Sequence, residues 1–98
     1  MNHNKENDAN AELANLLVKE LPLYQKNIMD ALQNENIEAL QYHSHQLYGV
    51  CCYLSIPKLQ TLAKTLELQA HSLPNEEINT LAQQMDQEIN QVIDQLKG

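Results

Sequence analysis

Apolar residues recur every three or four positions along most of this chain, and short polar or proline-containing stretches interrupt the pattern. This spacing places the apolar residues on one face of a helix, because an α-helix has about 3.6 residues per turn. The composition agrees, since 98 residues include only 2 Gly and 3 Pro and no Phe or Trp. The pattern therefore predicts an all-α protein.

The interruptions divide the chain into predicted helices at about residues 8–20, 22–33, 37–54, 56–72 and 75–96. Pro22 falls inside the first pattern, and proline lacks an amide hydrogen, so we expect the helix to kink or restart there. Asn36 is suited to cap the helix that follows it. Short connections favour antiparallel neighbours, which predicts an up-down antiparallel four-helix bundle with an additional N-terminal helical segment laid across one end. We expect residues 1–7 to be a frayed terminus and residues 8–97 to form a single domain.

Charge and hydropathy exclude several classes of function. The chain has 6 Lys+Arg against 13 Asp+Glu, a net charge of -7, which repels nucleic-acid phosphates and anionic lipid. No stretch approaches the roughly 20 apolar residues that cross a bilayer, and the polar start does not resemble a signal peptide. We therefore expect a cytoplasmic protein that neither binds nucleic acid nor inserts into a membrane. No Gly-rich phosphate-binding loop is present, so an ATP site of its own is not expected.

The predicted helix 37–54 carries a histidine opposite its apolar stripe. The stripe consists of Ile37, Leu40, Ser44, Leu47, Cys51 and Leu54. At about 100° per residue, His45 points away from this stripe and into solvent, whereas His43 lies at its edge and is assigned a structural role. Gly49 lies one turn beyond His45, and a glycine inside a helix costs roughly 1 kcal/mol relative to alanine. Bare backbone beside an exposed imidazole would let another molecule approach closely.

At this point the residues carry a family resemblance. The run HSHQLYGVCCYLSIPKLQTLAKTLE resembles the signature of histidine-containing phosphotransfer (HPt) domains. The residues that fall on this pattern are His45, Leu47, Gly49, Cys51, Leu54, Leu59, Leu62, Ala63, Leu66 and Glu67. Within the run, CCYLSIPKL is similar to the HPt modules that end BarA/GacS-type hybrid sensor histidine kinases. With the flanking helices, the likeness covers about residues 13–97.

The resemblance implies a phosphoryl-group carrier in a two-component phosphorelay. His45 would accept a phosphoryl group from a receiver-domain aspartate and pass it to another receiver aspartate. Such a domain binds no cofactor or metal of its own, and Mg²⁺ is expected on the partner receiver. An exposed imidazole suits this role, because its unperturbed pKa of about 6.5 leaves a free nitrogen lone pair near neutral pH. The residues expected to dock the receiver or support the site are Gly49, Tyr48, Gln41, Tyr42, Cys52 and Lys58.

The sequence departs from the family pattern at Tyr48, and also at Ser55, which replaces the common glycine, and at Val50, which is bulkier than the usual Ser or Ala. Tyr48 occupies the position where many members have Lys, so the usual cation near the phosphoryl group is missing from this helix. The resemblance then implies that phosphohistidine is either less stabilised here or depends on Lys58 or Lys64 from the next helix.

A metal site is the first alternative, because His43, His45, Cys51 and Cys52 are close in sequence and such residues ligate zinc. On one helix, however, His43 and His45 point about 200° apart, and Cys52 is about 10 Å along the axis from His45. We therefore expect no metal site.

A non-enzymatic adaptor or dimerisation bundle is the second alternative. It would bind a partner through Tyr42, Tyr48, Gly49 and Cys52 without being phosphorylated. A His45→Gln change would distinguish the two functions, because it should abolish phosphoryl relay and leave adaptor binding nearly intact. In the phosphorelay interpretation, we expect the domain itself to be monomeric.

Overall fold

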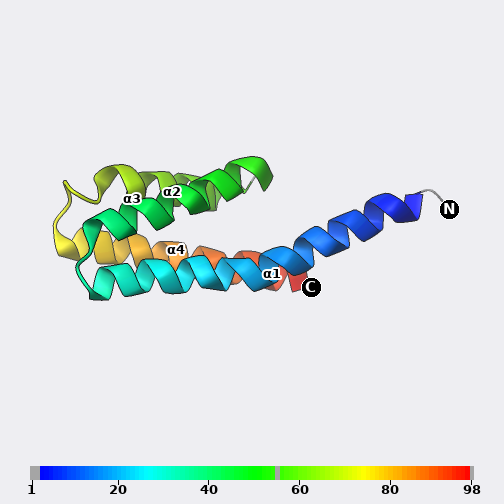
Figure 1. Cartoon of the computed structure of the whole chain (residues 1–98), viewed down its shortest axis with the longest axis horizontal. Helices are drawn as coiled ribbons and strands as arrows, with labels where there is room; N and C mark the ends of the chain where they lie inside the picture. The colour runs from blue at the N-terminus through cyan, green and yellow to red at the C-terminus, as the bar shows by residue number, and fades with distance from the viewer. Residues whose placement is uncertain (1–2, 55, 98) are drawn as a thin grey trace.

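The computed structural model describes the backbone of residues 3–54 and 56–97, and the side chains of residues 12–54 and 56–97. It contains four helices, α1 (His3–Gln33), α2 (Ile37–Leu54), α3 (Pro57–Gln69) and α4 (Asn75–Lys97), and no strand among the described residues. Each helix packs against its neighbours in the chain, and α1 also packs against α4 (Figure 1). The predicted all-α, up-down bundle is confirmed.

The core is aliphatic and uses the apolar stripe of every helix. The largest side chains that are fully buried include Leu21, Ile28, Leu40, Leu47, Leu59, Leu66, Met85 and Ile89. Burying one such side chain contributes roughly 1.5–3 kcal/mol. The core thus holds all four helices in fixed rotation about their axes, which decides where their outward-facing residues point.

The first helix differs from the prediction. It is one continuous helix that begins at His3 and runs through Pro22, so the predicted restart is wrong. Its ribbon bends in its N-terminal half (Figure 1). Pro22 is exposed, while Leu21 and Ile28 on either side of it are fully buried. Burial of residues on both sides of the proline offsets the roughly 3 kcal/mol that an interior proline costs.

The additional N-terminal segment is also different from the prediction. The first turns of α1 extend past the end of the bundle instead of lying across it (Figure 1). The backbone is helical from His3, inside the stretch expected to be frayed, whereas Met1 and Asn2 lie outside the described residues. A separate fifth segment is therefore absent from the described part of the chain.

The other helix boundaries follow the sequence closely. The bounds of α2 are those predicted, α4 extends one residue further, and α3 ends at Gln69 because the chain turns at residues 70–73. Asn36 caps α2 as predicted, since its Oδ1 accepts a hydrogen bond from the Ala39 amide at 3.0 Å. Glu35 adopts a left-handed backbone conformation, with φ 52°, and the Asn36 amide bonds back to the Ala31 carbonyl at 2.9 Å. This turn reverses the chain tightly between α1 and α2.

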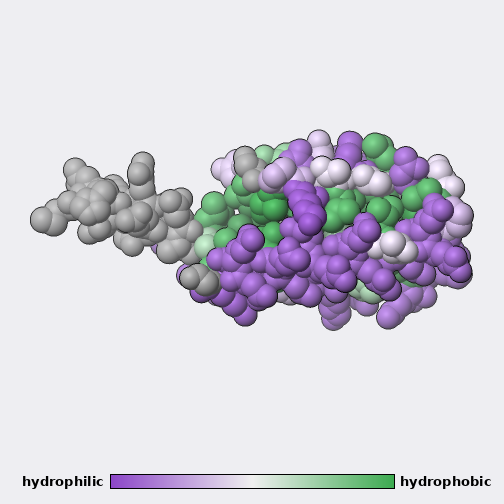
Figure 2. Space-filling view, turned by 180° about the vertical axis from the view of Figure 1, so that it is seen from behind, coloured by the Kyte–Doolittle hydropathy of each residue, from purple (hydrophilic) through white to green (hydrophobic). Residues whose placement is uncertain are grey.

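The end of the bundle from which α1 projects has apolar atoms at its surface (Figure 2). A cavity of about 470 Å³ at this end is lined mainly by apolar side chains, including Leu17, Leu54 and Val92. None of the four described helices combines the length and the hydropathy that crossing a bilayer requires.

Candidate functional site

Helix α2 presents His45 to solvent. Its inner side is anchored by the buried residues Leu40, Ser44, Leu47 and Cys51. The His45 side chain on the opposite side is 64% exposed, which confirms the predicted orientation. The imidazole is therefore held on a rigid, packed helix while remaining accessible to another molecule.

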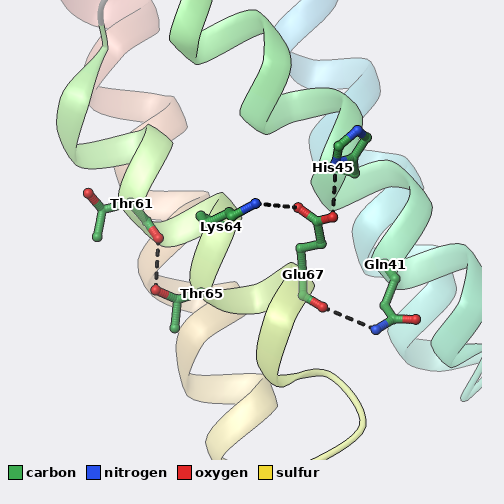
Figure 3. Close-up of polar contacts among 6 residues, drawn as sticks. All are labelled: Gln41, His45, Thr61, Lys64, Thr65 and Glu67. Carbon is green, nitrogen blue, oxygen red and sulfur yellow. Dashed lines mark hydrogen bonds and ion pairs between the residues drawn. The ribbon is translucent and has the colours of Figure 1, made fainter.

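Glu67 of α3 holds one nitrogen of the His45 ring. The Nδ1 atom of His45 lies 2.9 Å from Oε2 of Glu67 (Figure 3). Glu67 is only 20% exposed, and the preceding residue, Leu66, is fully buried, so the carboxylate projects from a fixed part of α3. A carboxylate accepts hydrogen bonds, which places the ring proton on Nδ1 and leaves the lone pair on Nε2. The contact thus favours the tautomer in which Nε2 carries the free lone pair.

Gln41 reinforces the same junction between α2 and α3. Its Nε2 donates a hydrogen bond to the backbone carbonyl of Glu67 at 3.1 Å (Figure 3). Gln41 lies four residues before His45, on the same face of α2. It therefore ties α3 to α2 directly beside the histidine, and the structure places it as a support for Glu67.

A lysine and a tyrosine flank the carboxylate. The Lys64 ammonium lies 3.9 Å from Oε1 of Glu67 and 4.6 Å from the centroid of the Tyr48 ring. A cation at this distance over an aromatic face is attracted by the ring. A hydrogen bond with Cys52 raises the pKa of the Tyr48 hydroxyl, and the negative charge of Glu67 adds to the rise. Tyr48 and Cys52 therefore belong to the α3 side of the histidine.

Lys58 does not reach this site. Its Nζ lies 3.4 Å from Oε2 of Glu88 on α4. Residues 58 and 64 are six positions apart, which is about 240° around a helix, so the two lysines face different sides of α3. Of the two cations considered from the sequence, the structure places Lys64 beside Glu67 and Lys58 beside Glu88 of α4.

Gly49 lies on the other side of His45, toward α1. It is exposed, and a Cβ added to it would meet nothing within 4 Å, so no neighbouring helix requires a glycine there. A cavity of about 490 Å³ lies beside it, with a largely apolar lining. The lining residues are Leu13, Leu16, Leu17, Glu20, Tyr24, Gln46, Gly49, Val50, Tyr53 and Leu54. This groove between α1 and α2, hereafter the Gly49 groove, adjoins the histidine-bearing face.

Tyr42 is exposed on the same helix and is fixed by its neighbours. Its hydroxyl accepts a hydrogen bond from Nε2 of Gln46 at 2.9 Å. Its ring meets the ring of half-buried His43 edge-on, with 5.2 Å between centroids. The residues expected to form one docking face are therefore divided between two sides of His45, with Gly49 toward α1 and Tyr48 and Cys52 toward α3.

The two cysteines differ in environment. Both are free thiols, Cys51 buried and Cys52 exposed. Burial, with a smaller contribution from Cys52, raises the pKa of Cys51 to about 12. Cys51 thus behaves as a small core residue, as its place in the apolar stripe predicted.

Glu67 is the functional candidate that sequence reasoning did not select. It lies on the family pattern as the final residue of the quoted run, but that position alone did not assign it a partner. The contact with His45 joins residues 22 positions apart. Only the packing of α3 against α2 brings them together.

A comparison with protein families gives one match, and it spans the helices that carry this site. The family model described as Hpt domain matches residues 12–98, which is most of the chain and includes His45 and Glu67. No match was found among curated proteins or among solved structures. Hpt domains work with receiver domains in phosphorelays, so the match supports a histidine phosphotransfer role. On the strength of this match, the chain belongs to the Hpt domain family.

Proposed function

We propose that His45 is the phosphorylated residue of this domain. It accepts a phosphoryl group from the aspartate of one receiver domain and transfers it to the aspartate of another. The observation that carries the proposal is the 2.9 Å contact between Nδ1 of His45 and Glu67, together with the exposure of the ring. A surface histidine used only for adaptor binding has no need of a carboxylate that selects its tautomer.

The contact supports a specific sequence of bond changes. The Nε2 lone pair attacks the phosphorus of the receiver's aspartyl phosphate and forms an N–P bond. The P–O bond to the aspartate breaks, and its electron pair leaves with the aspartate carboxylate. The ring becomes more positive as it donates its lone pair, and the Glu67 carboxylate stabilises this charge through the Nδ1 proton. In the second transfer a carboxylate oxygen of the next receiver's aspartate attacks the phosphorus and forms a P–O bond. The N–P bond breaks, and its electron pair returns to Nε2.

The surroundings of His45 suit a receiver as the partner. Phosphoryl transfer demands in-line positioning and charge neutralisation, and we expect the receiver to bring Mg²⁺. Gly49 has no side chain to hinder an approaching surface, and the Gly49 groove offers apolar contact next to the histidine. This arrangement supports a receiver that docks on α2 and also contacts the Gly49 groove between α1 and α2.

Several features of the proposal go beyond the family assignment. The likeness to BarA/GacS-type kinases, the cytoplasmic location, the monomeric state and the domain limits at residues 8–97 stay predictions. Surface detail spread over two helices selects the donor and acceptor receivers.

The experiment mixes the purified protein with aspartyl-phosphorylated receiver domains and Mg²⁺ and follows intact mass and the acid lability of the label. His45→Gln is compared with His43→Gln, a matched change two residues away on the same helix. We expect one acid-labile phosphoryl group on the wild type and on His43→Gln, and none on His45→Gln. Label on His45→Gln would overturn the assignment. Absence of label on the wild type, with receiver binding retained in His45→Gln, would favour the adaptor alternative.

A further inference from the structure

We infer that Glu20 determines which receivers this domain accepts, because it requires a Lys or Arg on the receiver surface that docks in the Gly49 groove. The inference rests on the proposed function and names the chemistry of the partner surface, which is apolar side chains that fill the groove and one cation that meets Glu20. It is carried by the position of a single carboxylate in the largely apolar lining of this groove.

The lining of the Gly49 groove contains one charged side chain, that of Glu20. Most of the other lining residues are apolar, and two of them, Leu16 of α1 and Tyr53 of α2, are 50% and 86% exposed. Gln46, which follows His45 in the chain, belongs to the same lining. A receiver surface that reaches His45 and covers the groove therefore covers Glu20 as well.

The negative charge of Glu20 acts inside the groove. None of the ion pairs between the described side chains includes Glu20, and α2, which forms the other wall, contains neither Lys nor Arg. Burial raises the pKa of the Tyr24 hydroxyl, which lines the same groove, and the charge of Glu20 adds to the rise. The carboxylate therefore gives the groove a negative potential that no cation of α2 offsets.

Docking changes the surroundings of this carboxylate. Glu20 is exposed in the free domain, and a receiver seated on the groove would remove water from it. A carboxylate that loses water without gaining a cation is costly to bury, whereas a Lys or Arg placed against it replaces the lost hydration. Glu20 thus favours receivers that bring a cation and disfavours those that bring an apolar or acidic group, and specificity is this difference in affinity.

Glu20 acts on docking and not on the transfer step. It belongs to α1, whereas Glu67, which contacts Nδ1 of His45, belongs to α3. The two carboxylates thus flank the histidine-bearing helix from different sides. A change at Glu20 should therefore alter the affinity for the receiver and leave the transfer rate at saturating receiver unchanged.

The test uses a receiver domain that labels His45 and measures its dissociation constant with the wild type, Glu20→Gln and Glu12→Gln at low salt. Glu12→Gln is the matched control, because it removes the same charge from an exposed position of α1 that does not line the groove. We expect Glu20→Gln to weaken binding about three- to fivefold, while Glu12→Gln stays near wild type. High salt should reduce the difference between the two variants, since it screens exposed charges. The transfer rate at saturating receiver should equal that of the wild type in both.

A charge exchange identifies the cation on the receiver. Each surface Lys and Arg of the receiver is changed to Glu in turn, and each receiver variant is measured against the wild type and against Glu20→Lys. One receiver variant should bind the wild type about tenfold more weakly and regain most of this loss with Glu20→Lys. Equal dissociation constants for Glu20→Gln and Glu12→Gln, or the absence of any rescued pair, would overturn the inference and leave the proposed function standing. A wild type that takes no label from any receiver would overturn both.

Discussion

Removal of the Glu67 carboxylate is the most direct test of the nitrogen that the proposed function makes the nucleophile, Nε2 of His45. A hydrogen bond to a charged group contributes about 1.5–3 kcal/mol. Because the His45 side chain is 64% exposed and solvent screens the contact, the low end of that range applies. About 1.4 kcal/mol corresponds to a tenfold change in rate, so Glu67→Ala should slow phosphoryl transfer to His45 about tenfold. Glu67→Gln keeps a neutral acceptor, which is roughly half as strong, and should slow transfer about threefold.

The assay is single-turnover transfer from a phosphorylated receiver at saturating concentration, so that docking does not limit the rate. Glu88→Gln is the control, because it removes a glutamate that contacts a lysine of α3 far from His45. Nitrogen NMR of the imidazole supplies a second readout, since the Nδ1-protonated tautomer should dominate in the wild type and decline in Glu67→Ala. Transfer by Glu67→Ala at the wild-type rate would refute the argument that this carboxylate prepares Nε2.

Four further predictions concern other residues of α2. Gly49→Ala should raise the free energy of unfolding by about 0.5–1 kcal/mol in urea titration, because the added Cβ meets nothing within 4 Å and alanine favours the helix more than glycine does. The same variant should bind the receiver more weakly. A lower free energy of unfolding would instead indicate that Gly49 has a packing role. Ser44→Ala should stabilise the fold by about 1 kcal/mol, since the Ser44 hydroxyl is buried with no hydrogen-bond partner among the described residues; a loss of stability on thermal melting contradicts this. Iodoacetamide at pH 8.5 should alkylate Cys52 and spare Cys51 on peptide mapping, because burial raises the Cys51 pKa from its ordinary 9.0 to about 12. The same pKa shift stabilises the folded state fully below pH 9. This contribution to the free energy of unfolding should be lost as the pH rises from 9 to 12, because the thiol of the unfolded chain ionises first. If the free energy of unfolding of Cys51→Ala fell equally steeply over this pH range, the prediction would be contradicted.

Local pattern determined much of the fold. The spacing of apolar residues predicted the bounds of α2 and nearly those of α4, because helical periodicity depends on neighbours three and four positions apart. The exposure of His45 followed from the same spacing, since a residue opposite the apolar stripe must face away from the core. The predicted restart of the helix at Pro22 was wrong because it rested on local sequence alone. Its local preference for a break is outweighed by tertiary burial of Leu21 and Ile28, which no local pattern measures.

The chemistry around His45 was decided by tertiary packing. Glu67 is 22 residues from the histidine, and its carboxylate reaches Nδ1 only because α3 packs on α2 in one particular rotation. The choice between Lys58 and Lys64 depends on that same rotation, which turns one toward Glu88 of α4 and the other toward Glu67. The sequence by itself determined which helix carries His45 and that this residue faces water. The rotation of α3 about its own axis comes from the joint packing of four apolar stripes. This rotation decided that Glu67 contacts the imidazole and that Lys64, not Lys58, contacts Glu67.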